Sequence, residues 1–302
     1  MALGDSAARK LANTTKTPPQ LARITPRWLV SLLQWAPVES GTFRVNRVKG
    51  DVPIEVACGT RDESDLPKGF VDYEEQPREY SLSAISTVLE VHTRVSDLYS
   101  QPYDQIREQL RLTIESVKER QEAELVNNVE YGLINNVHPS MKVRTRKGAP
   151  TPDDLDELIS KVWKEPAFFL AHPRAIAAFG RECTRRGVPP ATVNIFGSPF
   201  ITWRGLPIVP TDKLWVDGDD KAATTNILLM RVGEKKQGVV GLFQPGLPGE
   251  QTPGLSVRFM GITPKGISQY LISLYCSAAV LVPDALGVLE NVEVGHYHEY
   301  KY

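Results

Sequence analysis

The stretch PYDQIREQLRLTIESVKERQEAELVNNVEY, residues Pro102–Tyr131, decides the fold of this chain. Its apolar residues recur at steps of three and four, as on one face of an α-helix, and Gln121 interrupts the stripe. Charged residues of alternating sign occupy the other face. Pro102 suits a first helical turn and Gly132 a helix end. We therefore predict one helix over residues 102–131, about 45 Å long. The apolar stripe consists of Ile106, Leu110, Ile114, Val117, Leu125, Val129 and Leu133.

A helix of this length needs a long, flat partner, because globular helices average about a dozen residues. The segments on either side supply strands, and Thr87–Val95 alternates apolar and polar residues along its length. A coiled coil is the alternative, but the stripe has a break and no other heptads exist in the chain to pair with it. We therefore expect the helix to lie on a sheet.

Composition places the chain among soluble globular proteins of one or two domains. It has 302 residues, 41% hydrophobic and 24% charged, and a formal net charge of −1, so no global field favours nucleic acid or an anionic membrane. The three cysteines are widely spaced, which fits a reducing compartment without a disulfide framework. The longest apolar run, Tyr270–Val282, is 13 residues and too short to span a bilayer, and no signal-peptide core begins the chain. We expect a cytoplasmic protein.

Charge changes sign between two neighbouring segments near the N-terminus. Residues 1–50 carry eight basic against two acidic residues, a net +6, and residues 51–80 carry three basic against nine acidic residues, a net −6. Thr25-Pro26 begins a tryptophan-rich helix of about ten residues that cannot bury its own apolar face. The acidic stretch is mostly loop, flanked by strands at Thr42–Val48 and Thr87–Val95. We expect arm and loop to contact neighbouring subunits, with the charges matched between them; the alternative is a helix packed on its own domain.

The second half of the chain alternates helices and strands and then becomes rich in antiparallel strands. Thr151-Pro152-Asp153-Asp154 begins a helix, Phe168–Leu170 is a short buried strand, and a second helix runs from His172 to Gly187. A loop of about a dozen residues follows. Strands are then expected at Phe200–Trp203, Leu206–Val209, Asn226–Val232, Gly238–Phe243, Leu255–Ile262, Gln269–Val282 and Gly287–Val292.

Motifs for chemistry are absent from the sequence. It contains no P-loop, dinucleotide fingerprint, GxSxG elbow or HExxH motif. His296 and His298 share one side of a strand but lack an evident third metal ligand. Cys183 and Cys276 lie in apolar surroundings and are expected to be buried structural residues. We therefore predict a protein that is not an enzyme, with no catalytic, cofactor-binding or metal-binding residues.

The order of elements resembles the Hong Kong 97 bacteriophage capsid fold, an α+β fold. The strand ending Thr93–Tyr99, the long helix and the late strand ending Val282–Leu286 follow that order. The amino-acid sequence of the arm resembles that of the second family of encapsulins, in its A subtype, at Asn13–Leu21, Ile24–Leu29 and Gly41–Arg47. The resemblance covers almost the whole chain, and there is no room for the inserted nucleotide-binding-like domain of the B subtype.

This resemblance implies four regions with the names used for that capsid fold. The N-terminal arm covers residues 1–42 and the E-loop residues 43–86. The P-domain covers 87–150 and 255–282, with the spine helix at 102–131, and the A-domain covers 151–254 and 283–302. The loop after the second A-domain helix, about Arg185–Pro199, would gather around a five-fold axis, the alternative being an ordinary surface loop. Deleting residues around Val188–Ile195 should then widen the opening. The pore candidates are Arg185, Arg186, Gly187, Val188, Pro189, Pro190 and Asn194; the arm anchors are Trp28, Leu29, Leu32, Leu33 and Trp35.

The resemblance also implies a function. The chain would assemble with itself into an icosahedral shell, an encapsulin nanocompartment in the bacterial cytoplasm. The cargo implied for the A subtype is a cysteine desulfurase of sulfur metabolism, which carries pyridoxal phosphate and docks through a disordered N-terminal extension. The shell protein itself would need no cofactor, nucleic acid or membrane. A phage or prophage major capsid protein shares the fold and is one alternative; a soluble cytoplasmic enzyme is a more remote one.

Overall fold

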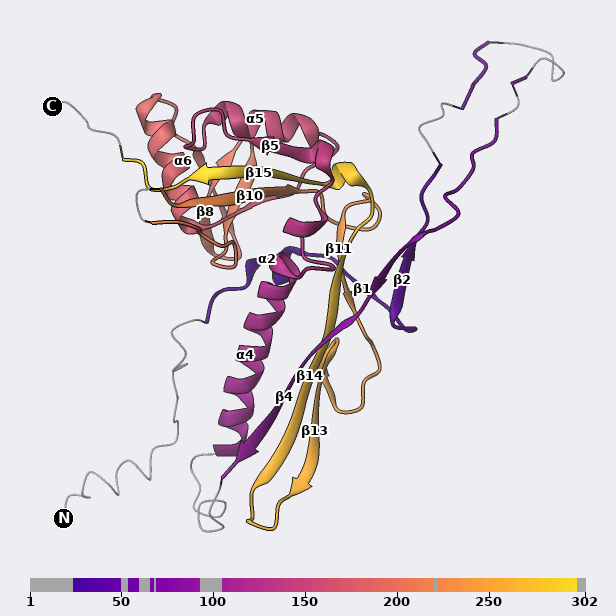
Figure 1. Ribbon diagram of the computed structural model, residues 1–302, viewed down its shortest axis with the longest axis vertical. Coiled ribbons are helices and arrows are strands. Elements are labelled where there is room, and N and C mark those ends of the chain that lie inside the picture. Colours follow the sequence, from indigo (N-terminus) through magenta and orange to yellow (C-terminus); the bar gives the residue numbers. More distant parts are fainter. Residues whose placement is uncertain are drawn as a thin grey trace.

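The computed structural model describes residues 24–49, 54–59, 66–67, 69–92, 105–219 and 222–297. Two sheets and a two-stranded excursion make up this part of the chain (Figure 1). The expected motifs at Asn13–Leu21 and Thr93–Tyr99, and the first helical turn at Pro102, lie outside the described residues.

The long helix lies along a long sheet, as the sequence predicted. Helix α4, Gln105–Asn127, runs beside the 13-residue strand β14, Ser268–Val280 (Figure 1). Leu110, Ile114 and Val117 of α4 pack against Ile272 and Leu274 of β14. The sheet orders its strands β1-β11-β14-β13-β12, with β4 also paired to β14. Their bounds are β1 Trp35–Pro37, β4 Ser83–Val91, β11 Val239–Phe243, β12 Glu250–Thr252 and β13 Leu255–Ile262.

The helix ends four residues before the predicted position. Asn128 accepts a hydrogen bond from the Glu130 amide through its side chain, at 2.9 Å, and the Gly132 amide bonds the Asn128 carbonyl at 2.9 Å. This turn redirects the chain, so that Leu133 is buried whereas Val129 is 87% exposed. The apolar stripe read from the sequence is therefore wrong at Val129.

The second sheet has seven strands in the order β5-β15-β10-β6-β9-β8-β7. The β5–β15 and β6–β9 pairs are parallel, so this sheet is mixed and not antiparallel throughout. Helices α5, Pro152–Lys161, and α6, Pro173–Arg185, pack on it and confirm the two predicted helices. The strands are β5 Lys142–Arg144, β6 Phe168–Ala171, β7 Ala191–Ile195, β8 Ser198–Trp203, β9 Leu206–Pro210, β10 Thr224–Met230 and β15 Leu286–Glu293.

Two strands lie in a sheet that is formed mainly by another of the regions expected from the sequence. Strand β11, within 151–254, pairs with β14 and so belongs to the long sheet. Strand β5, within 87–150, pairs with β15 and so belongs to the seven-stranded sheet. Short 3-10 turns lie in two of the connections between the sheets: η2 Ile134–Asn136 and η3 Pro139–Met141 between α4 and β5, and η4 Pro283–Ala285 between β14 and β15.

A two-stranded excursion projects away from both sheets (Figure 1). Strand β2, Thr42–Val45, pairs antiparallel with β3, Arg78–Ser81, and an isolated bridge joins Val48 to Tyr73 further out. The predicted strand Thr42–Val48 is thus shorter than expected, and the strand predicted at Thr87–Val95 is β4, which begins earlier.

Candidate pore segment and arm anchors

The C-terminal end of α6 turns the chain outward into the candidate pore segment. Ala175, Phe179 and Cys183 bury one face of α6 in the core. Gly187 then adopts a positive φ of 69°, and the Val188 amide bonds the Cys183 carbonyl at 3.0 Å. This closure at a left-handed glycine is a common helix end. It leaves Arg185, Arg186, Gly187, Val188 and Pro189 exposed.

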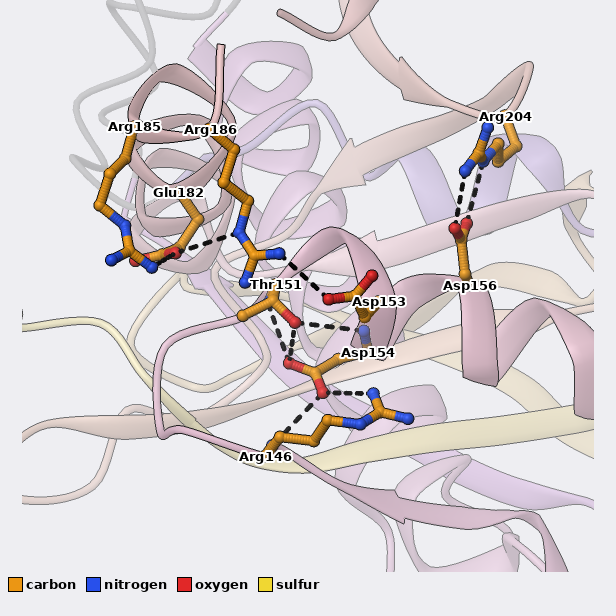
Figure 2. A network of polar contacts seen from close by, with 9 residues as sticks. All are labelled: Arg146, Thr151, Asp153, Asp154, Asp156, Glu182, Arg185, Arg186 and Arg204. Carbon is orange, nitrogen blue, oxygen red and sulfur yellow. Dashed lines mark hydrogen bonds and ion pairs between the residues drawn. The ribbon is translucent and has the colours of Figure 1, made fainter. Parts of the chain in front are cut away.

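Both arginines at this end are paired with carboxylates of the same chain (Figure 2). Glu182, only 2% exposed, lies 2.8 Å from Arg185 and 3.7 Å from Arg186. Arg186 also reaches Asp153 in the first turn of α5, at 3.0 Å. The Arg186 guanidinium therefore ties the end of α6 to α5, and the two pairings leave little uncompensated charge at the start of the segment.

Helix α5 begins where the sequence predicted, and its first turn has a capping box. Thr151 and Asp154 exchange side-chain and backbone hydrogen bonds, and Arg146 pairs with Asp154 at 2.9 Å (Figure 2). On the next turn of α5, Asp156 accepts hydrogen bonds from Trp203 at 2.7 Å and from Arg204. Hydrogen bonds from Arg204 and Trp203 lower the pKa of Asp156 against the opposing effect of burial. These contacts fix the end of β8 to α5.

The predicted irregular loop after Gly187 contains a strand. Residues 191–195 form β7, which pairs antiparallel with β8 along its whole length and stands at the edge of the sheet. Asn194 is on this strand and is exposed. The deletion expected to widen an opening, Val188–Ile195, would therefore remove a strand rather than a loop. The signal missed was the two-residue turn at Phe196-Gly197 between two runs rich in β-branched residues.

The arm helix is shorter than predicted and two of its anchors are buried in the chain's own core. Helix α2 spans only Trp28–Leu32 and is followed by β1, which pairs parallel with β11. Leu29 is 0% and Leu33 5% exposed. The expectation that the arm helix buries its apolar face on a neighbouring subunit is thus wrong for Leu29 and Leu33, and the alternative of packing on its own domain holds for them. Trp28, Leu32 and Trp35 are partly buried against the same core.

Trp35 also lies against the long sheet. Its ring occupies the space beside Gly241 of β11, where a Cβ atom would stand 2.6 Å from the indole, and its Nε1 donates to the Val30 carbonyl at 3.0 Å. Glycine is required there because the ring approaches the backbone so closely.

A polar cluster that sequence reasoning missed ties the arm to α4. Arg27 pairs with Glu115 at 2.6 Å and Glu119 at 3.1 Å, and the Thr25 amide donates to Glu119 at 2.8 Å. Lys213, from the segment after β9, reaches Glu119 at 2.8 Å. Burial would raise the pKa of Glu119, but hydrogen bonds from Lys213 and Thr25 outweigh it and hold the pKa below its usual range. In the sequence these glutamates look like ordinary surface charges of a helix.

Glu122, one turn further along α4, is 1% exposed. Its carboxylate accepts a hydrogen bond from the Thr211 hydroxyl at 3.0 Å, and one of its oxygens has no partner among the described residues. Burial raises the pKa of Glu122 to about 7, and hydrogen bonds from Thr211 and the Val30 amide only partly offset that effect.

The excursion exposes large apolar side chains around its acidic residues. Val56 and Phe70 are each 84% exposed and Tyr73 is 60% exposed. Glu74 and Glu75 follow Tyr73 in the chain and are exposed as well. Two basic residues of the segment 1–50 are already paired within the chain: Arg27 contacts Glu115 of α4, and Arg44 contacts Glu79 at 2.6 Å. The expected charge match between arm and loop therefore cannot rest on Arg27.

The remaining expectations concern cysteines, metals and membranes. Cys183 and Cys276 are buried, as predicted, and burial raises their thiol pKa values to about 11 and about 12. No group of three metal-ligating side chains occurs within the described ranges, and His298 lies outside them. No helix among the described residues is long and apolar enough to cross a membrane.

Comparisons with known proteins agree along the whole chain. A family model described as "Type 2A encapsulin shell protein SrpI-like" matches residues 40–296. The type 2A encapsulin shell protein SrpI of Synechococcus elongatus is 68% identical over 302 residues, covering 100% of this chain and 97% of that protein. A type 2A encapsulin shell protein of Mycobacterium leprae is 62% identical over 303 residues, covering 99% of this chain and 97% of that protein.

Solved structures give the same result for the fold. The cryo-EM structure of the holo-SrpI encapsulin complex of Synechococcus elongatus matches with a TM-score of 0.86 and 65% identity, over 100% of both chains. The capsid of a native GTA particle matches with a TM-score of 0.61 at 14% identity, over 96% of this chain and 100% of that one. The match to the GTA capsid, at 14% identity, is evidence for the fold alone. Together they confirm the expected Hong Kong 97-type capsid fold.

Proposed function

Because the chain belongs to the SrpI-like family of type 2A encapsulin shell proteins, we propose that its copies assemble into a closed nanocompartment that encloses a cargo enzyme. The smallest icosahedral shell holds about sixty copies related by closed point symmetry. The full-length match to other shell proteins and the capsid fold support this proposal.

The observation that carries it is the exposure of Val56, Phe70 and Tyr73 on the excursion. Exposed apolar side chains that gather on one segment mark an interaction site. The excursion is two-stranded and has too little core to bury them itself. A neighbouring copy of the chain supplies the missing surface in a shell, and the exposed carboxylates Glu74 and Glu75 then help to fix the register of that contact.

We propose further that the segment Arg185–Asn194 lines the opening at the five-fold axis. Its support is the run of exposed residues from Arg185 through Pro189 and along β7 to Asn194, on an edge strand that no strand of the described chain covers. Because Arg185 and Arg186 are paired with Glu182 and Asp153, the rim would present Val188, Pro189 and polar groups rather than a ring of free positive charge.

For the cargo we propose a cysteine desulfurase of sulfur metabolism, in the bacterial cytoplasm, loaded through an N-terminal extension of that enzyme. The resemblance of the arm to the A subtype supports this choice. Pyridoxal phosphate would belong to the cargo. The shell protein would act by enclosure and by control of access, without a catalytic group of its own.

Assembly is tested by expressing the chain alone and imaging it by electron microscopy. We expect closed particles of uniform diameter and a mass on the order of sixty chains by light scattering. A sample that contains only monomers or small discrete oligomers would overturn the proposal.

Cargo loading is tested by co-expressing a cysteine desulfurase from a bacterium that encodes both proteins, with and without its N-terminal extension. We expect the intact enzyme to co-sediment with shells and the truncated enzyme to stay soluble. Equal sedimentation of both forms would refute docking through the extension, and absence of both from the shells would refute this cargo.

A further inference from the structure

An aromatic residue occupies a turn position that ordinarily excludes it. Phe196 and Gly197 form the two-residue turn between β7 and β8, with Ile195 paired to Ser198, and both turn residues have positive φ, 51° and 78°. Such turns favour asparagine followed by glycine, because a bulky side chain at positive φ is sterically strained. Phe196 is also 67% exposed, so core packing does not account for it.

The contact that Phe196 makes is with the arm. The ring of Trp28, the first residue of α2, stacks on Phe196 with centroids 6.1 Å apart and planes 6° from parallel. The same indole meets Phe200 of β8 edge-on, with centroids 5.2 Å apart. Offset stacked and edge-to-face geometries are the favoured arrangements of aromatic pairs. Trp28 thus holds the tip of the hairpin and one residue on its inner strand.

The contact with Trp28 matters because the hairpin pairs with the rest of the sheet only at its far end. Strand β8 pairs with β9 only through Thr202 and Trp203, while its tip is four residues away. Trp203 is buried and donates to Asp156, which fixes that end to α5. Helix α2 lies between the seven-stranded sheet and the C-terminal end of α4 (Figure 1). Ile195, Phe200 and Ile201 pack on the main core beneath the hairpin, whereas the turn residue Phe196 is held by the arm and not by pairing with the sheet.

We propose that Trp28 clamps the β7–β8 hairpin and thereby sets the position of β7 and Asn194, so that the arm controls the geometry of the opening. The part of this inference that concerns the opening rests on the proposed function. The clamp itself is a contact within one chain and stands independently of it. Removal of the clamp frees the tip to move about its attachment at Trp203.

The test uses the full chain and two substitutions chosen to disturb the fold little. Phe196→Asn removes the ring and gives the turn its preferred asparagine-glycine sequence; Trp28→Leu keeps an apolar residue on α2. Trp215→Ala is the matched control, since Trp215 is also a large aromatic residue, 69% exposed, in a connection of the same sheet. Hydrogen exchange of the amides of residues 191–203 is measured in each variant, in shells and in unassembled chain, and cryo-EM maps of the shells are compared.

We expect exchange along β7 to become about two- to tenfold faster in both variants, since one or two aromatic contacts are lost, and to stay unchanged in Trp215→Ala. In the shell maps, density for β7 should weaken and the opening should change in width. Wild-type exchange in both variants would overturn the clamp, whatever the shells look like. Faster exchange with an unchanged opening would keep the clamp and refute its link to the opening. Maps that place Arg185–Asn194 away from the five-fold axis would refute the proposed pore. The exchange measurement would still show whether Trp28 clamps the hairpin.

Discussion

The carboxylate of Glu122 on α4 accepts a hydrogen bond from the hydroxyl of Thr211, which follows β9, at 3.0 Å. The contact joins the helix of the long sheet to the seven-stranded sheet in a place that solvent does not reach, since Glu122 is 1% exposed. Glu119, Lys213 and the Val30 amide face the same carboxyl group from α4, from the segment after β9 and from α2. A titratable group thus sits where three elements meet.

The folded chain should therefore become less stable as pH rises through the pKa range of Glu122. The pKa of Glu122 is raised from 4.5 to about 7, so the folded chain binds a proton more tightly than the unfolded chain, and this contribution is present at low pH and lost between about pH 4.5 and 7. The expected loss is about 3 kcal/mol per chain. Glu122→Gln should remove that part of the pH dependence, measured as the unfolding midpoint by calorimetry from pH 5 to 8. Glu130→Gln, at an exposed position, is the control, and an unaltered pH profile in Glu122→Gln would contradict the assignment.

The buried arm anchors should stabilise the subunit before it assembles. Leu29 is 0% exposed in its own chain, so Leu29→Ala should cost about 2–5 kcal/mol in the free energy of unfolding of unassembled protein. Leu32→Ala, at a partly buried position on the same helix, should cost less. Denaturant unfolding of dissociated chains measures both. Equal and small losses would mean that α2 acts only between subunits.

The excursion should show the opposite behaviour. Val56 and Phe70 are each 84% exposed, so Val56→Ser and Phe70→Ser should change subunit unfolding by less than about 0.5 kcal/mol. Both should weaken the shell, because they remove apolar surface that a neighbour would bury. The check is the guanidinium concentration at which light scattering reports shell dissociation. Variant shells that dissociate at the same guanidinium concentration as wild type would show that the excursion is not part of the interface.

The approach of Trp35 to β11 can be tested at a single glycine. Gly241→Ala places a Cβ 2.6 Å from the indole and should cost about 1–3 kcal/mol through overpacking. Gly180→Ala in α6 is the matched control: no atom lies within 4 Å of the added Cβ, and helix propensity predicts a gain of about 0.5–1 kcal/mol. Thermal unfolding of the two variants should move in opposite directions, and a shift of the same sign would refute the close contact.

If the proposed pore segment lines the opening, the size of the side chain at position 194 should change the width of that opening. Asn194→Trp adds a large side chain at an exposed position of the edge strand and should narrow the opening without disturbing the shell. The measurement is the rate at which a small dye leaves loaded particles, with a cryo-EM map to confirm intact shells. Narrowing should slow the release, and an unchanged rate in intact particles would show that Asn194 does not face the opening.

Periodicity in the sequence was enough to predict the two features that determine the architecture. The stripe of α4 and the alternation of its flanking strands depend on local spacing, so the helix on a long sheet could be inferred and is confirmed. Strand β7 was not predicted because four of its five residues are exposed, so its sequence lacks the alternation of apolar and polar residues that marks a half-buried strand. The partners of Leu29, Glu119 and Glu122 come from segments about 90 residues away or more, so no local pattern could identify them.

The parallel pairing of β1 with β11 also has a mechanical consequence. The Val38 amide bonds the Phe243 carbonyl and the Gly241 amide bonds the Gln34 carbonyl, each at 2.8 Å, so the arm is joined by a ladder to the sheet that contains β14. A pull along the arm loads these hydrogen bonds together, in shear, rather than opening them one after another. Swelling pressure inside a particle would therefore stretch the long sheet before it detached the arm, and particles should fail at contacts between chains while each chain stays folded.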